Sequence, residues 1–202
     1  MRGYYTYIIE VDDRYLNTNE DGLIINTEIS ERDYMFVNRI GKVTATPILE
    51  NYGDIEPGDE VIVHHNVFRT YYDIRGKLKN SSNFLEGNLF KVESELIYAT
   101  RKPGGQWTCL PGFCFVEPIK DTNSWHQETE VALKGTLVIG GKETERLGLK
   151  IGDVVGFTPD SEYEFNIEGD TLYRIQTNSL NIICNEGKRT KTEDNQELSQ
   201  SA

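Results

Sequence analysis

Gly152-Asp153-Val154-Val155-Gly156-Phe157 decides the fold, because a similar stretch, Gly58-Asp59-Glu60-Val61-Ile62-Val63, lies 94 residues upstream. The same offset of 94 residues relates Gly135 to Gly41. A second matched run follows each stretch, LFKV at residues 89–92 and LYRI at residues 172–175. Two copies that fill the chain predict two tandem domains, whereas a repeat array would need more copies.

Each Gly-Asp unit predicts a turn followed by a β-strand. Gly58 and Gly152 are free to take positive φ, and the Asp that follows each can bond to the neighbouring backbone. The residues that come next suit a strand on one face of a small barrel. The chain holds 11 Tyr and 8 Phe, and no segment has an apolar stripe of 3.6-residue period and helix length. We therefore predict an all-β protein made of two tandem small β-barrels.

The duplication also sets the predicted domain boundaries. The first domain covers residues 1–101, a turn at 102–106 joins it to the second domain at 107–185, and the charged tail at 186–202 is expected to be disordered. The first copy contains an insertion at 68–88, because 31 residues separate Gly58 from Leu89 whereas 20 separate Gly152 from Leu172. The second copy has the shorter loop, predicted at 121–134.

Charge and cysteine content limit the classes of partner and the compartment. The net charge of −12 argues against nucleic acid or an anionic membrane as the main partner. No apolar run approaches the ~20 residues that a membrane helix needs, and the first ten residues lack a signal-peptide core. The three cysteines include no CxxC pair, which fits a reducing compartment. A cytoplasmic protein is expected.

One apolar island, Gly22-Leu23-Ile24-Ile25, interrupts the polar segment that follows the first predicted strand. Three adjacent aliphatic side chains invite edge pairing and aggregation when they are exposed in a connecting loop. The island is therefore either a short buried strand or a segment presented to a binding partner.

Catalytic and metal-binding patterns are weak throughout the sequence. His64 and His65 are adjacent and, as strand residues, would face opposite sides of a sheet. Cys109 and Cys114 have no second pair nearby, which makes a poor zinc signal. The run Gly140-Gly141-Lys142-Glu143 has Thr136 and Glu143 where a phosphate-binding loop needs Gly and Ser or Thr. We expect no enzyme activity, no catalytic residues, no cofactor and no metal.

The order of parts resembles the GroES-type co-chaperonin family. In that family a first strand leads into a mobile loop with a Gly-plus-aliphatic anchor, then a strand with Gly, a roof hairpin, a Gly-Asp turn and a final strand. The parts that match this order are Ile8-Ile9-Glu10-Val11, Gly22-Leu23-Ile24-Ile25, Gly41-Lys42-Val43, Gly58-Asp59-Glu60-Val61 and residues 92–99. The second copy matches at Val116, Gly135-Thr136-Leu137-Val138, Gly152-Asp153-Val154-Val155 and residues 172–184, without the Gly-plus-aliphatic anchor.

The resemblance implies two GroES-like barrels and a binding role in protein folding. The loop at 17–32 would bind a chaperonin ring of the GroEL type and bury Leu23, Ile24 and Ile25, with Gly22 beside them. A homo-oligomeric ring would present several loops at once, so that weak single contacts add through avidity. Two other hypotheses stay open: a structural or assembly adaptor, viral or cellular, that packs the island against its own neighbour, and a ligand-binding barrel that uses tyrosines such as Tyr71 and Tyr72.

Overall fold

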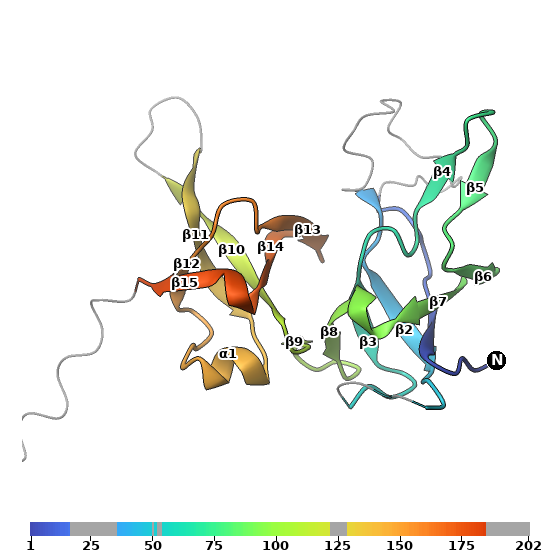
Figure 1. Ribbon diagram of the computed structural model, residues 1–202, viewed down its shortest axis with the longest axis horizontal. Coiled ribbons are helices and arrows are strands. Elements are labelled where there is room, and N and C mark those ends of the chain that lie inside the picture. The colour runs from blue at the N-terminus through green and yellow to red at the C-terminus, as the bar shows by residue number, and fades with distance from the viewer. Residues whose placement is uncertain (17–35, 50, 52–53, 122–128, 185–202) are drawn as a thin grey trace, which may run out of the picture.

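The computed structural model describes residues 1–16, 36–49, 51, 54–121 and 129–184 (Figure 1). In this part of the chain strands dominate, and the one α-helix, α1 (Lys142–Arg146), has five residues. The all-β prediction is confirmed. The strands are β1 (Thr6–Glu10), β2 (Ile40–Ala45), β3 (Glu60–Val63), β4 (Thr70–Tyr72), β5 (Leu78–Asn80), β6 (Phe84–Glu86), β7 (Leu89–Glu93), β8 (Ile97–Arg101), β9 (Thr108–Cys109), β10 (Phe113–Asp121), β11 (Thr129–Ile139), β12 (Val154–Phe157), β13 (Tyr163–Ile167), β14 (Asp170–Gln176) and β15 (Leu180–Ile183).

The two larger sheets have the same strand order. The first runs β6-β7-β1-β2-β3-β8-β9 and the second runs β13-β14-β10-β11-β12-β15, so the second repeats the first six strands of the first. A 3₁₀ turn precedes the last shared strand in both copies, η2 (Ser94–Leu96) before β8 and η3 (Thr177–Ser179) before β15. The duplicated motifs of the sequence therefore occupy equivalent strands and turns.

The strand register agrees residue by residue between the copies. Ile9 lies opposite Val43 in β1 and β2, and Val116 lies opposite Leu137 in β10 and β11. The register shifts at equivalent places, between Ile8 and Ile9 in the first sheet and between Phe115 and Val116 in the second. The two sheets share both the strand pairing and the position of the register shift. This is a stronger sign of duplication than the shared strand order, because a bulge changes which side chains face the core.

The Gly-Asp turns have the predicted conformation. Gly58 has φ of +100° and Gly152 has φ of +92°. The Gly58 N–H donates to the Val43 carbonyl (2.7 Å), and the Gly152 N–H donates to the Leu137 carbonyl (2.8 Å). The Asp side chain of each turn accepts a backbone N–H three residues earlier, Asp59 from Glu56 (2.8 Å) and Asp153 from Lys150 (2.9 Å). The turns thus rest on glycine at positive φ and on a local carboxylate acceptor.

Gly41 and Gly135 occupy equivalent positions, and at both of them the neighbouring strand packs too closely for a side chain. A Cβ on Gly41 would lie 2.5 Å from Cγ2 of Ile9, and one on Gly135 would lie 2.7 Å from Cγ2 of Val116. Both positions face the same bulge in the strand beside them, where there is no room for a side chain.

The two described sheets are open rather than closed barrels. β6 and β9 are the edges of the first sheet, and β13 and β15 are the edges of the second. Each of these edge strands pairs with one neighbour among the described strands, so hydrogen bonding does not close either sheet on itself. Apolar side chains instead form one cluster within each repeat and a third cluster between them.

Three details differ from the predicted boundaries. β11 already begins at Thr129, so residues 129–134 are strand and the loop expected at 121–134 is shorter, because this stretch pairs with the end of β10. The insertion at 68–88 contains a separate two-stranded sheet, β4 and β5. β9 adds to the first sheet by pairing with β8, although it follows the 102–106 turn. The tail at 186–202 lies outside the described residues.

Candidate functional site

The predicted anchor, Gly22, Leu23, Ile24 and Ile25, lies outside the described residues, as does the rest of the loop predicted at 17–32. The structure does describe the residues from which this loop departs. Tyr15 and Val37 form an isolated antiparallel bridge. The Leu16 N–H donates to the Phe36 carbonyl and the Asn38 N–H donates to the Arg14 carbonyl, both at 2.8 Å. The segment between Leu16 and Phe36 therefore starts and ends at adjacent points of the fold.

Core packing holds this loop base in place. The Tyr15 side chain is 8% exposed and Val37 is fully buried, and both belong to the apolar cluster of the first repeat. Burying two apolar side chains contributes roughly 1.5–3 kcal/mol each. The base is thus part of the folded core of the first repeat.

The insertion at 68–88 supplies most of the polar contacts to the loop base. The Tyr15 Oη lies 2.7 Å from Thr70 Oγ1 and accepts the Thr70 N–H at 3.0 Å. Arg14 donates to Asn80 Oδ1 (2.8 Å) and to the Gly87 carbonyl (2.9 Å). The Arg14 guanidinium also lies 4.9 Å from the ring centroids of Phe84 and Phe90.

These loop-base residues were missed by sequence reasoning. Tyr15 stands in a polar stretch, and Thr70 is 55 residues further along the chain, so no local pattern joins them. An apolar residue near each end of the predicted loop was the only signal available. The insertion, which had no assigned role, now has one: it braces the point from which the loop departs.

The second repeat has an equivalent hairpin at the same end of the molecule. Lys120 lies opposite Glu130 and Asp121 lies opposite Thr129 in β10 and β11, which brings the ends of the segment 122–128 together. Figure 1 shows this end of β10 and β11 at the top of the view, as it does β4 and β5, whereas α1 lies at the bottom. The described residues that flank the corresponding loops therefore lie at one end of both repeats.

The contact between repeats contains the two adjacent histidines. β3 ends at Val63, so His64 and His65 lie beyond the strand, and their ring centroids are 4.2 Å apart. The expectation that they face opposite sides is therefore wrong, because the strand alternation stops before them. The Tyr163 hydroxyl of the second repeat lies 2.6 Å from His65 Nδ1.

The electrostatics of this pair favour neutral rings. Burial lowers the pKa of His64 to about 4, and the nearby Arg39 and Arg174 charges act in the same direction. Burial lowers the pKa of His65 to about 3, with His64, Arg39 and Arg69 contributing. The described residues contain no cluster of three or more His, Cys, Asp or Glu side chains that could hold a metal ion. The histidines serve as packing and hydrogen-bonding groups between the repeats.

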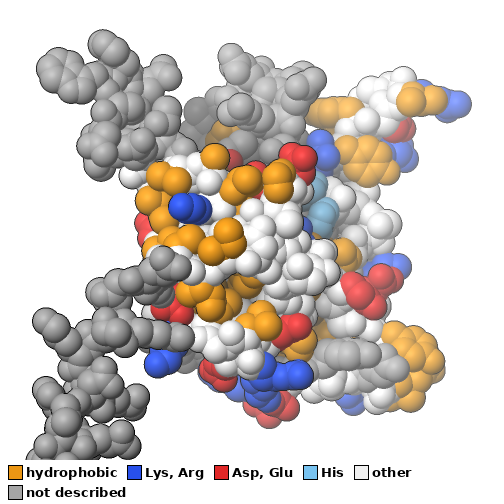
Figure 2. Space-filling model, turned by 60° about the vertical axis from the view of Figure 1, so that its left-hand side comes forward, with side chains coloured by type: hydrophobic (Ala, Val, Ile, Leu, Met, Phe, Trp, Pro, Cys, Tyr) orange, Lys and Arg blue, Asp and Glu red, His pale blue; other side chains and the backbone are white. Residues whose placement is uncertain are grey.

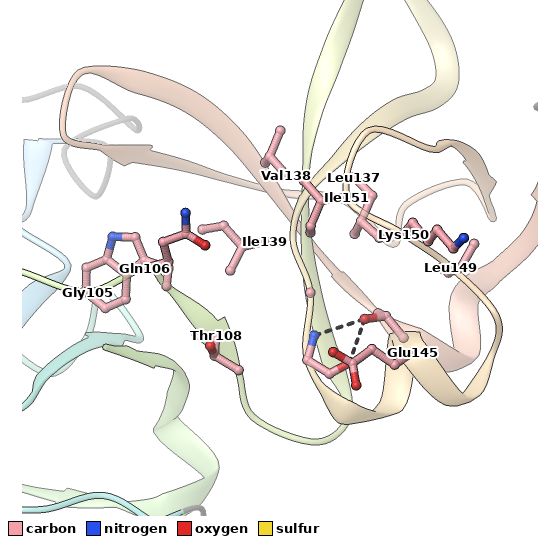
Figure 3. Close-up of a pocket in the computed structure, with 14 residues that line it drawn as sticks. Gly105, Gln106, Thr108, Leu137, Val138, Ile139, Glu145, Leu149, Lys150 and Ile151 are labelled. Carbon is pink, nitrogen blue, oxygen red and sulfur yellow. Dashed lines mark hydrogen bonds between the residues drawn. The ribbon is translucent and has the colours of Figure 1, made fainter. Parts of the chain in front are cut away.

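A cleft of about 650 Å³ lies between the 105–108 segment, β11 and α1 (Figure 3). Its walls include the apolar side chains of Leu137, Ile139 and Ile151. The Thr144 hydroxyl accepts the Gly141 N–H (2.9 Å) and donates to the Gly141 carbonyl (2.8 Å), so it is already satisfied. Among the described residues that line the cleft, Glu145 and Lys150 are charged and none is His or Cys. The cleft thus lacks a paired nucleophile and base.

The two buried thiols, those of Cys109 and Cys114, are equally unsuited to nucleophilic chemistry. Burial raises the pKa of Cys114 to about 12 and raises that of Cys109 well above its ordinary value. All three cysteines are free, and Cys109 and Cys114 are buried. Protonated, buried thiols are inert at neutral pH.

Comparison with known proteins finds no matching family model and no curated protein of significant sequence similarity. Among the described residues, no helix has the length and apolar character needed to cross a membrane.

Proposed function

We propose that the chain is a tandem GroES-like co-chaperonin, which caps a chaperonin ring of the GroEL type and assists protein folding. The observation that carries the proposal is the duplicated sheet with matching registers and bulges, in which the residues that flank the corresponding loops lie at one end of both repeats. A cap must present several binding segments on the same face, and this arrangement meets that need. In this proposal each repeat is one GroES-like unit built on an open sheet, and the cap acts in the cytoplasm.

The contact with the chaperonin is made by Gly22, Leu23, Ile24 and Ile25. Three buried aliphatic side chains contribute roughly 1.5–3 kcal/mol each, whereas ordering a peptide segment costs about 1–2 kcal/mol per residue. A single loop therefore binds weakly, and several loops on one oligomer raise the affinity by ~10²–10⁴. The firm base at Tyr15 and Val37 supports this role, because it limits the residues that must be ordered to those of the loop itself.

The second repeat has a structural role in this proposal. Its loop lacks the Gly-plus-aliphatic anchor, but its sheet has the same strand order as the first and packs against it. It acts as a spacer that holds the anchor-bearing loops apart around the oligomer. The proposed mechanism is binding without catalysis, and it uses no cofactor or metal.

The test is capture of a chaperonin ring in the presence of nucleotide. The wild type should be captured, and a variant with Leu23→Ser, Ile24→Ser and Ile25→Ser should not. The control is a Leu147→Ser, Ile151→Ser variant, which changes exposed aliphatic side chains near α1, at the end away from the loop bases. Capture by the wild type and the control alone supports the proposal, provided that circular dichroism shows the triple variant folded.

The assembly-adaptor hypothesis predicts a different outcome. If the aliphatic island packs against a neighbouring repeat, the triple variant loses stability or assembles incorrectly, and the wild type captures no chaperonin. Failure of the wild type to bind any chaperonin ring would therefore reject the co-chaperonin proposal and favour the adaptor.

A further inference from the structure

A small polar pocket lies at the base of the hairpin formed by β4 and β5, in the insertion of the first repeat. Its volume is about 280 Å³, and the described residues that line it are Asn66, Arg69, Tyr71, Ser81, Ser82 and Asn83. One of them is cationic, the others are neutral, and none is Asp or Glu. In a chain with a net charge of −12, this pocket is therefore lined by one positive charge and by side chains that can donate hydrogen bonds.

The Arg69 side chain differs from two other arginines that contact the first repeat. Its Nε atom is buried and has no hydrogen-bond partner among the described residues. By contrast, Arg14 donates to Asn80 Oδ1 (2.8 Å) and Arg101 donates to Glu168 (2.6 Å). A buried donor without an acceptor is costly, and the cost is larger when the group is charged. The Arg69 guanidinium therefore needs an acceptor that the described residues do not supply.

Two lining side chains are already bonded within the fold, and others are available. Ser81 Oγ donates to the Val67 carbonyl (2.6 Å), and the Asn83 amide donates to the Lys91 carbonyl (2.9 Å). These bonds hold one wall of the pocket in place. Ser82 is exposed, as is Asn66 on the facing stretch of chain, so the donors of both remain accessible to a ligand.

The surroundings of the pocket add positive potential. The Asn66 N–H donates to His64 Nδ1 (3.1 Å), so the pocket adjoins the histidine pair. Burial lowers the pKa of His65 most, and His64, Arg39 and Arg69 lower it further. Figure 2 shows histidine side chains at the surface of the molecule, so ions in the solvent can reach this region.

We propose that this pocket binds a small tetrahedral oxyanion of the phosphate type. The planar guanidinium of Arg69 can form two parallel N–H···O bonds with such an ion, and Ser82 and Asn66 can donate to its other oxygens. Donors from two separate stretches, 66–71 and 81–83, suit an ion with oxygens on several sides better than a flat carboxylate. The volume suits one such ion, because pockets for drug-sized ligands have about 300–1,000 Å³. The site goes beyond the proposed function and does not depend on chaperonin binding.

The pocket is next to the contacts that brace the loop base. Thr70, which bonds to Tyr15, and Asn80, which bonds to Arg14, each adjoin lining residues in the chain. A ligand that restrains the pocket should therefore also restrain the loop base. Phosphate should slow hydrogen exchange at the Leu16 amide, which belongs to that base.

Thermal unfolding at increasing concentrations of inorganic phosphate tests the proposal, with the ionic strength held constant by sodium chloride. A ligand that binds only the folded state raises the unfolding temperature as its concentration rises. The wild type should show this rise with phosphate and with sulfate, but not with acetate or additional chloride. An equal response to all four anions, or to none of them, would overturn the proposal, because it would show general ionic effects or no site.

A pair of charge-removing variants locates the binding site. Arg69→Gln should weaken phosphate binding roughly 10- to 100-fold, because it removes the charge-assisted hydrogen bonds. The control Arg75→Gln removes the same charge from an exposed position in the same hairpin, outside the pocket lining, and should bind phosphate like the wild type. Loss of the phosphate response in both variants, or in neither, would place the binding elsewhere and overturn the proposal.

Stability without phosphate separates binding from a structural role of Arg69. In phosphate-free buffer Arg69→Gln should not lower the unfolding temperature, because the wild-type side chain has a buried nitrogen without an acceptor there. A lower unfolding temperature in that buffer would show that Arg69 stabilises the fold itself and would count against the site.

Ser82→Ala provides a second test at an exposed residue, where loss of folding is not expected. It should weaken phosphate binding roughly 2- to 10-fold, the effect of one neutral hydrogen bond. Unchanged phosphate affinity in this variant would contradict the assigned lining. Because none of these experiments contains a chaperonin, their failure is distinguishable from failure of the capture experiment.

Discussion

Gly58 and Gly152 hold nearly the same backbone conformation in equivalent turns, with φ of +100° and +92°. Each donates its N–H to the strand that precedes it, to the carbonyl of Val43 in one repeat and of Leu137 in the other. No atom lies within 4 Å of the position that a Cβ would take at either glycine, so space does not select glycine there. The positive φ of the backbone is what favours glycine at both positions.

Replacing either glycine with alanine should therefore destabilise the protein through backbone strain alone. We expect Gly58→Ala and Gly152→Ala each to lower the free energy of unfolding by about 1–3 kcal/mol, the usual cost of a non-glycine residue in a sparsely populated region. Urea unfolding measures the change, with Lys150→Ala in the same turn as the control. Unchanged stability of both glycine variants would show that the turns relax to another conformation.

The loop base offers a test of the bond between Tyr15 and the insertion. Tyr15→Phe removes the hydroxyl that lies 2.7 Å from Thr70 Oγ1 and accepts the Thr70 N–H. The expected cost is about 0.5–1.5 kcal/mol, and the amides of Leu16 and Asn38 should exchange hydrogen faster. Hydrogen exchange read by mass spectrometry checks this, and Tyr4→Phe at an exposed position is the control. Unaltered exchange at the base would mean that packing of Val37 alone holds it.

The histidine pair predicts loss of stability in mild acid. Above pH ~6.5 both rings are neutral in the folded and unfolded chain, so they add no pH dependence. Below that pH the unfolded chain takes up protons that the folded protein resists until the pH approaches about 4 for His64 and about 3 for His65. The unfolded state is therefore favoured progressively as the pH falls from 6.5 to 4.

A His64→Gln, His65→Gln variant should lose less stability than the wild type over this pH range. Thermal or urea unfolding at several pH values between 7 and 4 gives the comparison, and His126→Gln serves as the control histidine. If the double variant shows the same pH dependence as the wild type, the low pKa values are not the cause of the acid sensitivity.

The ion pair between repeats should contribute modestly and depend on salt. Arg101 donates to Glu60 (2.5 Å) and to both carboxylate oxygens of Glu168 (2.6 and 3.1 Å), and its guanidinium lies 4.3 Å from the Trp107 ring centroid. Because the Glu168 side chain is 49% exposed, a double-mutant cycle of Arg101→Ala and Glu168→Gln should give a coupling of roughly 0.5–1 kcal/mol. The coupling should shrink as salt rises.

Arg101→Lys separates charge from geometry in this contact. Lysine keeps the positive charge but cannot form the two parallel bonds to Glu168, so it should recover only part of the coupling. Full recovery by lysine would show that the planar guanidinium geometry is unimportant.

Local chemistry explains which parts of the fold were predictable. The Gly-Asp turn depends on one glycine and on a carboxylate that bonds three residues back, as Asp59 and Asp153 both do. The adjacent histidines show the opposite case. Their prediction assumed that β3 continued through them, and the strand ends at Val63, where the chain turns toward Tyr163 of the other repeat. The end of a strand depends on its neighbours as much as on its own residues.

The candidate site likewise has one part that the sequence reveals and another that only the structure shows. Gly22, Leu23, Ile24 and Ile25 stand out as an aliphatic island in a polar segment, and that contrast is readable without coordinates. The base of their loop is not readable, because Arg14 reaches Asn80 across 66 residues and Tyr15 reaches Thr70 across 55. Contacts over such distances leave no periodic pattern in the chain.

The sequence by itself determined the duplication, the all-strand character and the turn at each Gly-Asp, because each depends on a residue's own conformational limits or on its near neighbours. Only the tertiary structure decided that β9 adds to β8, that the two larger described sheets stay open, and that no described strand pairs with the outer edge of β15. Strand order and edge occupancy depend on contacts between residues far apart in the chain. The same Gly-Asp turn before β3 and β12 can therefore occur in two sheets whose last equivalent strands differ, since β8 pairs with β9 and β15 has no second partner among the described strands.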